Sequence, residues 1–288
     1  MLYEQTTLNC NGHLLDLSDP IVMGVINVTP DSFYPGSRFS GEDAVLAQAE
    51  QMLIEGSNPE TSGGAILDIG GMSSRPGAKI ISEGEELQRV LPVVKAIIKR
   101  FPDALISIDT IRSGVAKACI SEGACMVNDI SAGKYDPQMF ETIAALQNVP
   151  YILMHMKGDT PDTMQKQAFY DDIAVEVLDF FIKKIGILRG LGVKDIVIDP
   201  GFGFGKKINH NYTLLKQLHV FKILEVPILA GLSRKSMIWK TLNITPEEAL
   251  NGTSILNFVA LQQGAKILRV HDVKEAMQAI QLFKRLTE

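Results

Sequence analysis

The sequence has few of the residues and patterns that mark secreted, membrane-bound or disulfide-rich proteins. Only three of its 288 residues are cysteines, Cys10, Cys119 and Cys125, and they show neither a CxxC motif nor the Cys/His spacing of a metal site. An odd number of unclustered cysteines argues against a disulfide framework and is expected for reduced thiols. No apolar run approaches the length of about 18 residues that a membrane helix needs. The N-terminus has no basic region followed by an apolar stretch, so we expect a cytoplasmic protein.

Clustered positive charge is also missing. The chain has 28 Lys and Arg residues against 33 Asp and Glu residues, a formal net charge of -5, and its basic residues are scattered. This distribution argues against a nucleic-acid partner, and an anionic ligand would need a local basic site. No Pro/Gly/Ser-rich linker divides the chain, and its 46% hydrophobic content suffices for one large core. We therefore expect a single domain that spans residues 1-288.

What the sequence does contain is a regular alternation of short apolar runs with longer amphipathic stretches. The eight runs of strand length begin at Ile21, Ala65, Ala104, Cys125, Pro150, Asp195, Pro227 and Lys266. Between them lie helical patterns such as EDAVLAQAEQMLIEG and HDVKEAMQAIQLFKRL. This alternation predicts an α/β protein with a parallel sheet covered by helices.

Two α/β folds would satisfy this pattern, a doubly wound open sheet and a (β/α)8 TIM barrel. The open sheet usually carries a Gly-rich phosphate fingerprint directly after its first strand. Here the first run leads instead into NVTPDSF, so the barrel is favoured. Residues 1-19 have strand propensity around Asn11-Gly12, which is a hairpin turn signal. We expect them to form a short N-terminal β-hairpin that plugs the barrel floor.

Polar residues follow each of the eight apolar runs. Catalytic groups of a TIM barrel come from the C-terminal ends of its strands and the loops that follow. In chain order the residues at these positions are Asn27, Gly70 and Gly71, Asp109, Asn128 and Asp129, His155, Asp199, Ser233 to Lys235, and Arg269 with His271. Every predicted strand thus directs hydrogen-bonding groups toward one mouth of the barrel.

The acidic and amide residues of this set suit a ligand edge that is rich in N–H donors. An Asp or Asn just past a strand is most often a helix N-cap, an explanation that fits Asp109 well. Asp199 lies in DPGFGFGK, where the glycines allow a planar ligand to approach the backbone. Together with Asn128, the two carboxylates would match the donor edge of a 2-amino-4-oxo-pterin. The same oxygen atoms could also hold a divalent cation such as Mg²⁺.

Cationic residues follow the last two predicted strands, where TIM barrels commonly bind phosphate. Ser233, Arg234 and Lys235 stand between a strand and a helix start, and Arg269 and His271 follow the eighth strand. An anionic substrate is therefore expected here. Lys235 considered alone could equally be a solvated surface lysine.

Two Gly/Pro-rich loops, NVTPDSFYPGSRFSG and GGMSSRPGAK, would complete the mouth as lids. In the second loop Arg75 precedes Pro76. The Arg75 guanidinium would be a bidentate donor to phosphate, held by the stiff turn that proline forms. Phe33 in the first loop could close over an aromatic ring. For either loop alone, an ordinary surface turn is the alternative.

Eight strings in this order, NVTPDSF, GGMSSRPG, SIDT, NDI, LMHM, DPGFGFGK, LSRKS and RVHD, resemble the motif series of the dihydropteroate synthase family over nearly the whole chain. The resemblance implies that 6-hydroxymethyl-7,8-dihydropterin pyrophosphate condenses with p-aminobenzoate to give 7,8-dihydropteroate and pyrophosphate. It also implies Mg²⁺ as cofactor and a homodimer formed through helices near the C-terminus. These small-molecule substrates would be the partners, with no membrane involved.

The resemblance also assigns roles to individual positions. Asp109, Asn128, Asp199 and Lys235 match residues that hold the dihydropterin, Met154 and Phe204 flank its pocket, and Arg269 stacks on its ring. Asn27, Arg75, Arg269 and His271 match residues that bind pyrophosphate, and Asn27 also helps to place Mg²⁺. Phe33, Ser74, Arg75, Pro76, Phe204 and Ser233 match residues around p-aminobenzoate and in the adjoining loops. The catalytic set implied is Asn27, Arg75, Asp109, Lys235, Arg269 and His271.

The sequence departs from the family pattern in the second loop. Two other classes of pterin-binding protein would have parts of the same pattern. Met72 and Ser74 stand where relatives more often have Glu and Thr. A corrinoid-type pterin methyltransferase would give no reason for SRPG and SRKS. A non-catalytic pterin-binding paralogue would not need the cationic residues, although Met72 keeps this alternative open.

Overall fold

The computed structural model describes residues 5–28, 38–57, 65–72, 80–158 and 168–287. Two strands form a hairpin, β1 (Thr7–Cys10) and β2 (His13–Asp16). The barrel strands are β3 (Ile21–Asn27), β4 (Ile66–Gly70), β5 (Leu105–Asp109), β6 (Met126–Asp129), β7 (Tyr151–Met154), β8 (Ile196–Asp199), β9 (Leu229–Ala230) and β10 (Ile267–Val270). The α-helices are α1 (Arg38–Gly56), α2 (Glu83–Arg100), α3 (Ser113–Ser121), α4 (Met139–Leu146), α5 (Ile173–Gly190), α6 (Ile208–Lys216), α7 (Ser236–Leu242), α8 (Leu250–Gln262) and α9 (Val273–Thr287), with 3₁₀ helices η3 (Leu218–Leu224) and η4 (Glu247–Ala249).

The predicted (β/α)8 barrel is confirmed. The eight strands from β3 to β10 pair in parallel in the order β8-β7-β6-β5-β4-β3-β10-β9. A parallel bridge between Ile198 and Ile228 joins the two ends of this order, and Ile198 N donates to Pro227 O at 3.0 Å. An open doubly wound sheet would leave these two edges apart. β9 is shorter than the predicted run, since Ile228 forms only an isolated bridge and Pro227 has no N–H to donate.

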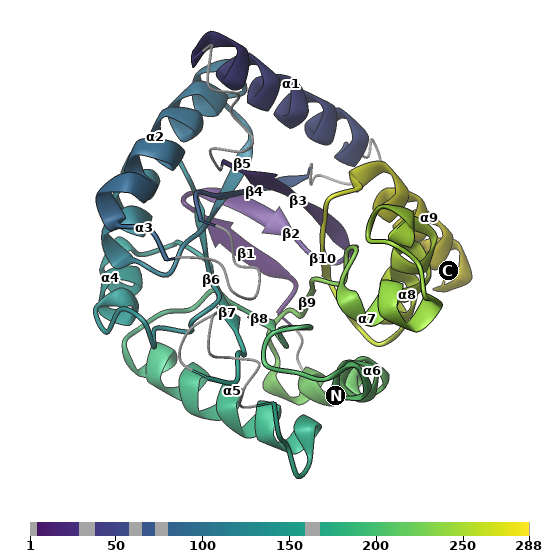
Figure 1. Ribbon diagram of the computed structural model, residues 1–288. Helices are drawn as coiled ribbons and strands as arrows, with labels where there is room; N and C mark the ends of the chain where they lie inside the picture. The colour runs from purple at the N-terminus through teal and green to yellow at the C-terminus, as the bar shows by residue number, and fades with distance from the viewer. Residues whose placement is uncertain (1–4, 29–37, 58–64, 73–79, 159–167, 288) are drawn as a thin grey trace.

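The helices form a ring outside the strands, with α9 returning beside α1 (Figure 1). α2 illustrates how local sequence signals determine the two ends of such a helix. Ser82 is its N-cap and accepts from Glu85 N, while Lys99 and Arg100 stand in the last turn, as the helix dipole favours. The buried apolar side chains of α2, Val90, Val93, Val94 and Ile97, belong to the continuous apolar core that includes barrel strands such as β4 and β5.

The hairpin lies across the middle of the ring of strands in Figure 1. Its turn uses Asn11 at φ 53° and Gly12 at φ 98°, as the Asn-Gly signal predicts. Leu8, Cys10, Leu15 and Leu17 form a buried cluster with residues at or near the starts of the barrel strands, among them Ile21, Ile66, Met126 and Ile267. The hairpin therefore packs at the amino end of the barrel, away from the carboxyl ends of the strands.

We expect Leu15→Ala to lower the free energy of unfolding by about 2–5 kcal/mol, because it removes buried methyl groups from this cluster. Leu14→Ala is the matched control, since Leu14 is 73% exposed and Leu15 only 2%. Urea denaturation measures both. Equal midpoints for the two variants would mean that the hairpin does not share the cooperative core.

Within the described ranges, no helix combines the length and the apolar character that crossing a membrane requires.

Candidate active site

The carboxyl ends of four neighbouring strands bring predicted site residues into one row. The pairing register aligns Asn27 with Gly70, Gly70 with Asp109, and Asp109 with Asn128. Farther round the barrel, Met154 is aligned with Asp199. Residues widely separated in the chain thus reach the same mouth of the barrel, which is where TIM-barrel enzymes have their active sites.

Arg269 joins two carboxylates at this mouth. Its Nε donates to Asp68 and its Nη2 to Asp109, both at 2.6 Å, and Asn128 Nδ2 also donates to Asp68 at 3.0 Å. Burial raises the pKa of Asp109 to about 7, although Arg269 opposes this rise. Burial alone would lower the pKa of Arg269, but the two carboxylates raise it above its ordinary value. Asp109 is therefore not the N-cap of α3 but one end of a buried ion-pair network.

A second acid–base pair lies across the mouth, where Asp199 faces Lys235. Asp199 accepts from Gly201 N at 2.7 Å, and burial raises its pKa against the effect of Lys235. The Lys235 ammonium donates to Phe202 O and lies 4.9 Å from the centre of the Phe204 ring. Burial lowers the pKa of Lys235 to about 8, opposed by Asp199. Lys235 is thus not a freely solvated surface lysine.

Ser233 and His271, predicted from two different motifs, are also brought together. Ser233 Oγ lies 2.9 Å from His271 Nδ1 and accepts from His271 N at 3.2 Å. Arg234 is the exception in this segment. Its Nε and Nη2 each donate at 2.9 Å to the carboxylate of Asp272, and its Nη1 donates to Pro246 O and Glu247 O. The guanidinium of Arg234 therefore holds the α7–α8 connection to the start of α9, at a position where the sequence pattern suggests an anion-binding cluster.

An apolar wall completes the described part of the mouth. Met154 clusters with Met72, Ile111, Ile130 and Met156, and Phe204 packs against this cluster. Met72 is 8% exposed. The side chain that departs from the family pattern therefore contributes packing beside the predicted pterin pocket.

The chain is similar to known proteins over nearly its whole length. The family model described as pterin binding enzyme matches residues 23–271. The dihydropteroate synthase of Escherichia coli is 43% identical over 277 residues, which cover 96% of this chain and 94% of the relative. This chain belongs to the dihydropteroate synthase family.

Solved structures of the family share the fold throughout. The dihydropteroate synthase of Xanthomonas albilineans with 4-aminobenzoic acid superposes with a TM-score of 0.88 at 37% identity and covers 98% of both chains. The structure of the enzyme from the same organism in complex with 7,8-dihydropteroate has a TM-score of 0.84 at 35% identity, again over 98% of both chains.

Two buried charged residues, Asp68 and Lys206, do not stand at a predicted strand end and could not be assigned from that pattern. Asp68 is fully buried in the middle of β4, and its Oδ1 has no hydrogen-bond partner among the described residues. The signal was a charged residue inside an otherwise apolar strand, because such residues are almost never fully buried unless paired. Lys206, the last residue of DPGFGFGK, is buried as well and contacts His155.

Four predicted residues of the dihydropteroate synthase pattern, Phe33, Ser74, Arg75 and Pro76, lie outside the described residues. The structure does describe the two ends of the second loop. Arg89 donates to Gly71 O at 2.9 Å before the loop, and Arg112 donates to Ile81 O after it. Arg112 also pairs with the buried Glu86, whose carboxylate accepts from Thr110 at 2.7 Å. Both loop ends are thus tied to α2 or to the β5–α3 connection.

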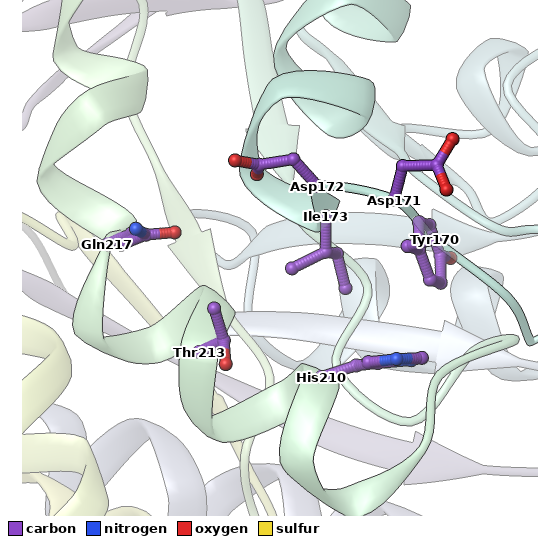
Figure 2. A pocket seen from close by; sticks show the side chains of 7 residues that line it. All are labelled: Tyr170, Asp171, Asp172, Ile173, His210, Thr213 and Gln217. Carbon is purple, nitrogen blue, oxygen red and sulfur yellow. The ribbon is translucent and has the colours of Figure 1, made fainter.

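A cavity of about 290 Å³ elsewhere in the molecule is not this site. Figure 2 shows its lining, which comes from the segment at the start of α5 (Tyr170, Asp171, Asp172, Ile173) and from α6 and its C-cap (His210, Thr213, Gln217). No residue of the predicted dihydropteroate synthase site lines it. The strand-end cluster, with its paired charges, is the better candidate for chemistry.

Proposed function

We propose that this chain condenses 6-hydroxymethyl-7,8-dihydropterin pyrophosphate with p-aminobenzoate to give 7,8-dihydropteroate and pyrophosphate. The observation that carries the proposal is the meeting of acidic and cationic groups at one barrel mouth: Asp109 and Asn128 beside Arg269, and Asp199 beside Lys235. The relatives complexed with 4-aminobenzoic acid and 7,8-dihydropteroate support the choice of substrates.

The carboxylates and the amide bind the dihydropterin. Asp199 accepts from the N–H groups of the pterin edge, and Asn128, on the adjacent side of the mouth, has an amide that both donates and accepts. The apolar cluster with Met154 contacts one side of the bicyclic ring. The flat Arg269 guanidinium, held in place by Asp68 and Asp109, stacks on its face.

The chemical step transfers the pterinylmethyl group. The C–O bond to pyrophosphate breaks, the aniline nitrogen of p-aminobenzoate forms the new C–N bond, and this nitrogen then loses a proton. Arg75, Arg269 and His271 bind the departing pyrophosphate and stabilise its growing charge. The electron-rich dihydropterin stabilises positive charge on the methylene carbon. The C–O bond to pyrophosphate therefore breaks largely before the C–N bond forms. No nucleophilic side chain is required.

Asn27 is the residue proposed to hold Mg²⁺. It is exposed at the end of β3, and its amide oxygen is a ligand type that Mg²⁺ accepts. Among the residues that the structure describes, no group of three His, Cys, Asp or Glu side chains is arranged to hold a metal. A single amide oxygen would suit Mg²⁺, which usually keeps several waters when a protein binds it. When bound there, Mg²⁺ would neutralise charge on the pyrophosphate leaving group.

Pyrophosphate release by the purified protein tests the proposed reaction. The protein is given the dihydropterin pyrophosphate and Mg²⁺, with and without p-aminobenzoate, and with EDTA in place of the metal. We expect release that depends on p-aminobenzoate and on Mg²⁺, with dihydropteroate appearing in equal amount by chromatography. Pterin binding in calorimetry without release would identify a non-catalytic pterin-binding protein instead.

The affinity for the dihydropterin pyrophosphate is expected to fall as the pH rises through about 8. The free protein holds Lys235 with a pKa of about 8, and above this pH the amine must take up a proton before it can act as a cationic donor. The loss is then about tenfold per pH unit, as proton linkage requires. Calorimetry between pH 6.5 and 9.5 measures it, and Lys235→Gln should bind weakly with no inflection near 8. An unchanged inflection in that variant would assign it to another group.

We further propose a homodimer formed through the C-terminal helices. Leu242, Ile255, Leu282 and Leu286 are each more than half exposed, and they lie on α7, α8 and α9, which are neighbours in the fold. Exposed apolar residues that gather on one face mark a candidate interface. Light scattering of the protein should give twice the chain mass, and Ile255→Glu with Leu282→Glu should give the monomer. Retention of the dimer in this double variant would exclude these helices as the dimer interface.

Finally, we propose that the protein works in the cytoplasm. Cys10, Cys119 and Cys125 are all free and buried, which suits a reducing compartment. Fractionation of the source cells tests this location, and enrichment in the membrane fraction would contradict it.

A further inference from the structure

Lys206 has an environment that is unusual for a lysine. The residue is 4% exposed, and its Nζ lies within hydrogen-bonding distance of four acceptors. It donates to Gly201 O at 2.8 Å, Phe204 O at 3.1 Å and His155 O at 3.2 Å, and it lies 2.9 Å from His155 Nδ1. Three of these acceptors are backbone carbonyls, which only a group with several N–H donors can satisfy together.

The carbonyls converge because the Gly201–Gly205 loop, defined here as residues 201–205, lies directly on the end of β7. Gly201 has φ +70° and Gly205 has φ +65°, a region that favours glycine. A Cβ at Gly201 would lie 2.0 Å from His155 O, and one at Gly205 would lie 2.6 Å from Lys157 O. Such close approach crowds carbonyl oxygens together, and the Lys206 amino group supplies the N–H donors between them.

Three other side chains outside the loop also bind its backbone. Lys235 donates to Phe202 O, Asn211 Oδ1 accepts from Gly203 N at 2.7 Å, and the Tyr170 hydroxyl donates to Gly205 O at 3.1 Å. Each of these side chains makes one hydrogen bond to the loop. Lys206 differs, because it contacts both ends of the loop and the end of β7 at once.

The loop carries groups that face the barrel mouth. Asp199, two residues before it, accepts from Gly201 N, and the Phe204 ring packs against the Met154 cluster beside the Lys235 ammonium. The carbonyl groups of Gly201 and Phe204 are the two loop groups that Lys206 binds. A shift of this backbone would therefore displace Phe204 first, while Asp199 keeps its place at the end of β8.

We propose that Lys206 is a positioning residue that fixes the Gly201–Gly205 loop on the end of β7 and thereby sets the place of Phe204 at the p-aminobenzoate side of the mouth. The role of the loop in binding p-aminobenzoate rests on the proposed function. The role of Lys206 in ordering the loop does not, so the two can be tested separately.

The test compares Lys206→Met with two controls and one conservative variant. Lys207→Met makes the same substitution at the next residue, whose side chain is exposed. Phe181→Leu removes buried packing on α5 and controls for lost stability. Lys206→Gln restores two N–H donors without the charge and serves as the conservative variant, and as a substitute if Lys206→Met does not fold.

Two quantities are measured on each protein, backbone hydrogen exchange of the peptide that covers residues 199–206 and the steady-state constants for dihydropteroate synthesis. Lys206→Met should exchange faster in this peptide and show a KM for p-aminobenzoate raised by about tenfold or more, since a misplacement of about 1 Å can cost that much. Its kcat should change less. Lys206→Gln should lie between wild type and Lys206→Met, and both controls should keep wild-type exchange in this peptide and wild-type KM.

Unchanged exchange and unchanged KM in Lys206→Met would overturn the proposal, as would equal effects in Phe181→Leu. If the wild-type protein makes no dihydropteroate, the proposed function fails, and the exchange data alone still decide whether Lys206 orders the loop.

Discussion

Arg269→Ala is expected to lower kcat/KM by about 10³-fold, because the variant loses both a stacking surface for the pterin and a cation that stabilises the departing pyrophosphate. The structure adds a second consequence. Arg269 is the ion-pair partner of Asp68 and Asp109, whose side chains are 0% and 11% exposed. Removal of one partner from a buried ion pair destabilises a protein by about 3–5 kcal/mol. Steady-state kinetics and urea denaturation measure the two effects.

Arg234→Ala is the matched control for this variant. Arg234 also makes a two-point contact with a carboxylate, that of Asp272, but this pair holds the start of α9. We expect Arg234→Ala to lose stability while its kcat/KM, measured on the folded fraction, stays near wild type. Normal turnover in Arg269→Ala would show that the anion site has been assigned to the wrong residues.

The second large effect is expected for Asp199→Asn, which should lower kcat/KM by about 10²-fold. The substitution replaces a carboxylate by an amide that has one acceptor atom fewer, and hydrogen bonds to a charged group contribute about 1.5–3 kcal/mol each. Asparagine keeps the acceptor for Gly201 N, so the Gly201–Gly205 loop should stay in place. Calorimetry with the dihydropterin pyrophosphate separates weaker binding from a slower chemical step.

Asp199→Asn should not destabilise the protein near neutral pH. Burial raises the pKa of Asp199 above its value of 3.8 in the unfolded chain, so the folded protein binds more protons between the two values. In that window the contribution of Asp199 to stability falls as the pH rises, and asparagine removes this dependence.

Asp129→Asn is the matched control, because Asp129 is a buried aspartate at the end of β6. Its carboxylate accepts from Tyr151 Oη at 2.6 Å and from the backbone N–H groups of Ser131 and Gly133. We expect this variant to lose stability and to keep its pterin affinity. A larger loss of pterin affinity in Asp129→Asn than in Asp199→Asn would reverse the two assignments.

The amino-acid sequence by itself determined the order of strands and helices and the polar residues at the strand ends. Local rules suffice for these features, since alternating apolar runs specify strands and helices, and parallel strands place their carboxyl ends on one side. For this reason Asn27, Asp109, Asn128 and Asp199 could be assigned to one mouth before the structure was known. The Asn11-Gly12 turn was predictable because few residues adopt positive φ.

Only the tertiary structure decided which of these charged groups pair with each other. Arg234 and Lys235 are neighbours in sequence, yet one pairs with Asp272 outside the mouth and the other faces Asp199 inside it. Asp68 and Lys206 can be identified as functional candidates only from their contacts with Arg269 and His155, which lie 201 and 51 residues away in the chain. The physical reason is that barrel closure and the approach of the Gly201–Gly205 loop to β7 create these pairs. Local sequence carries the donors and acceptors, whereas the closed barrel sets the distances between them.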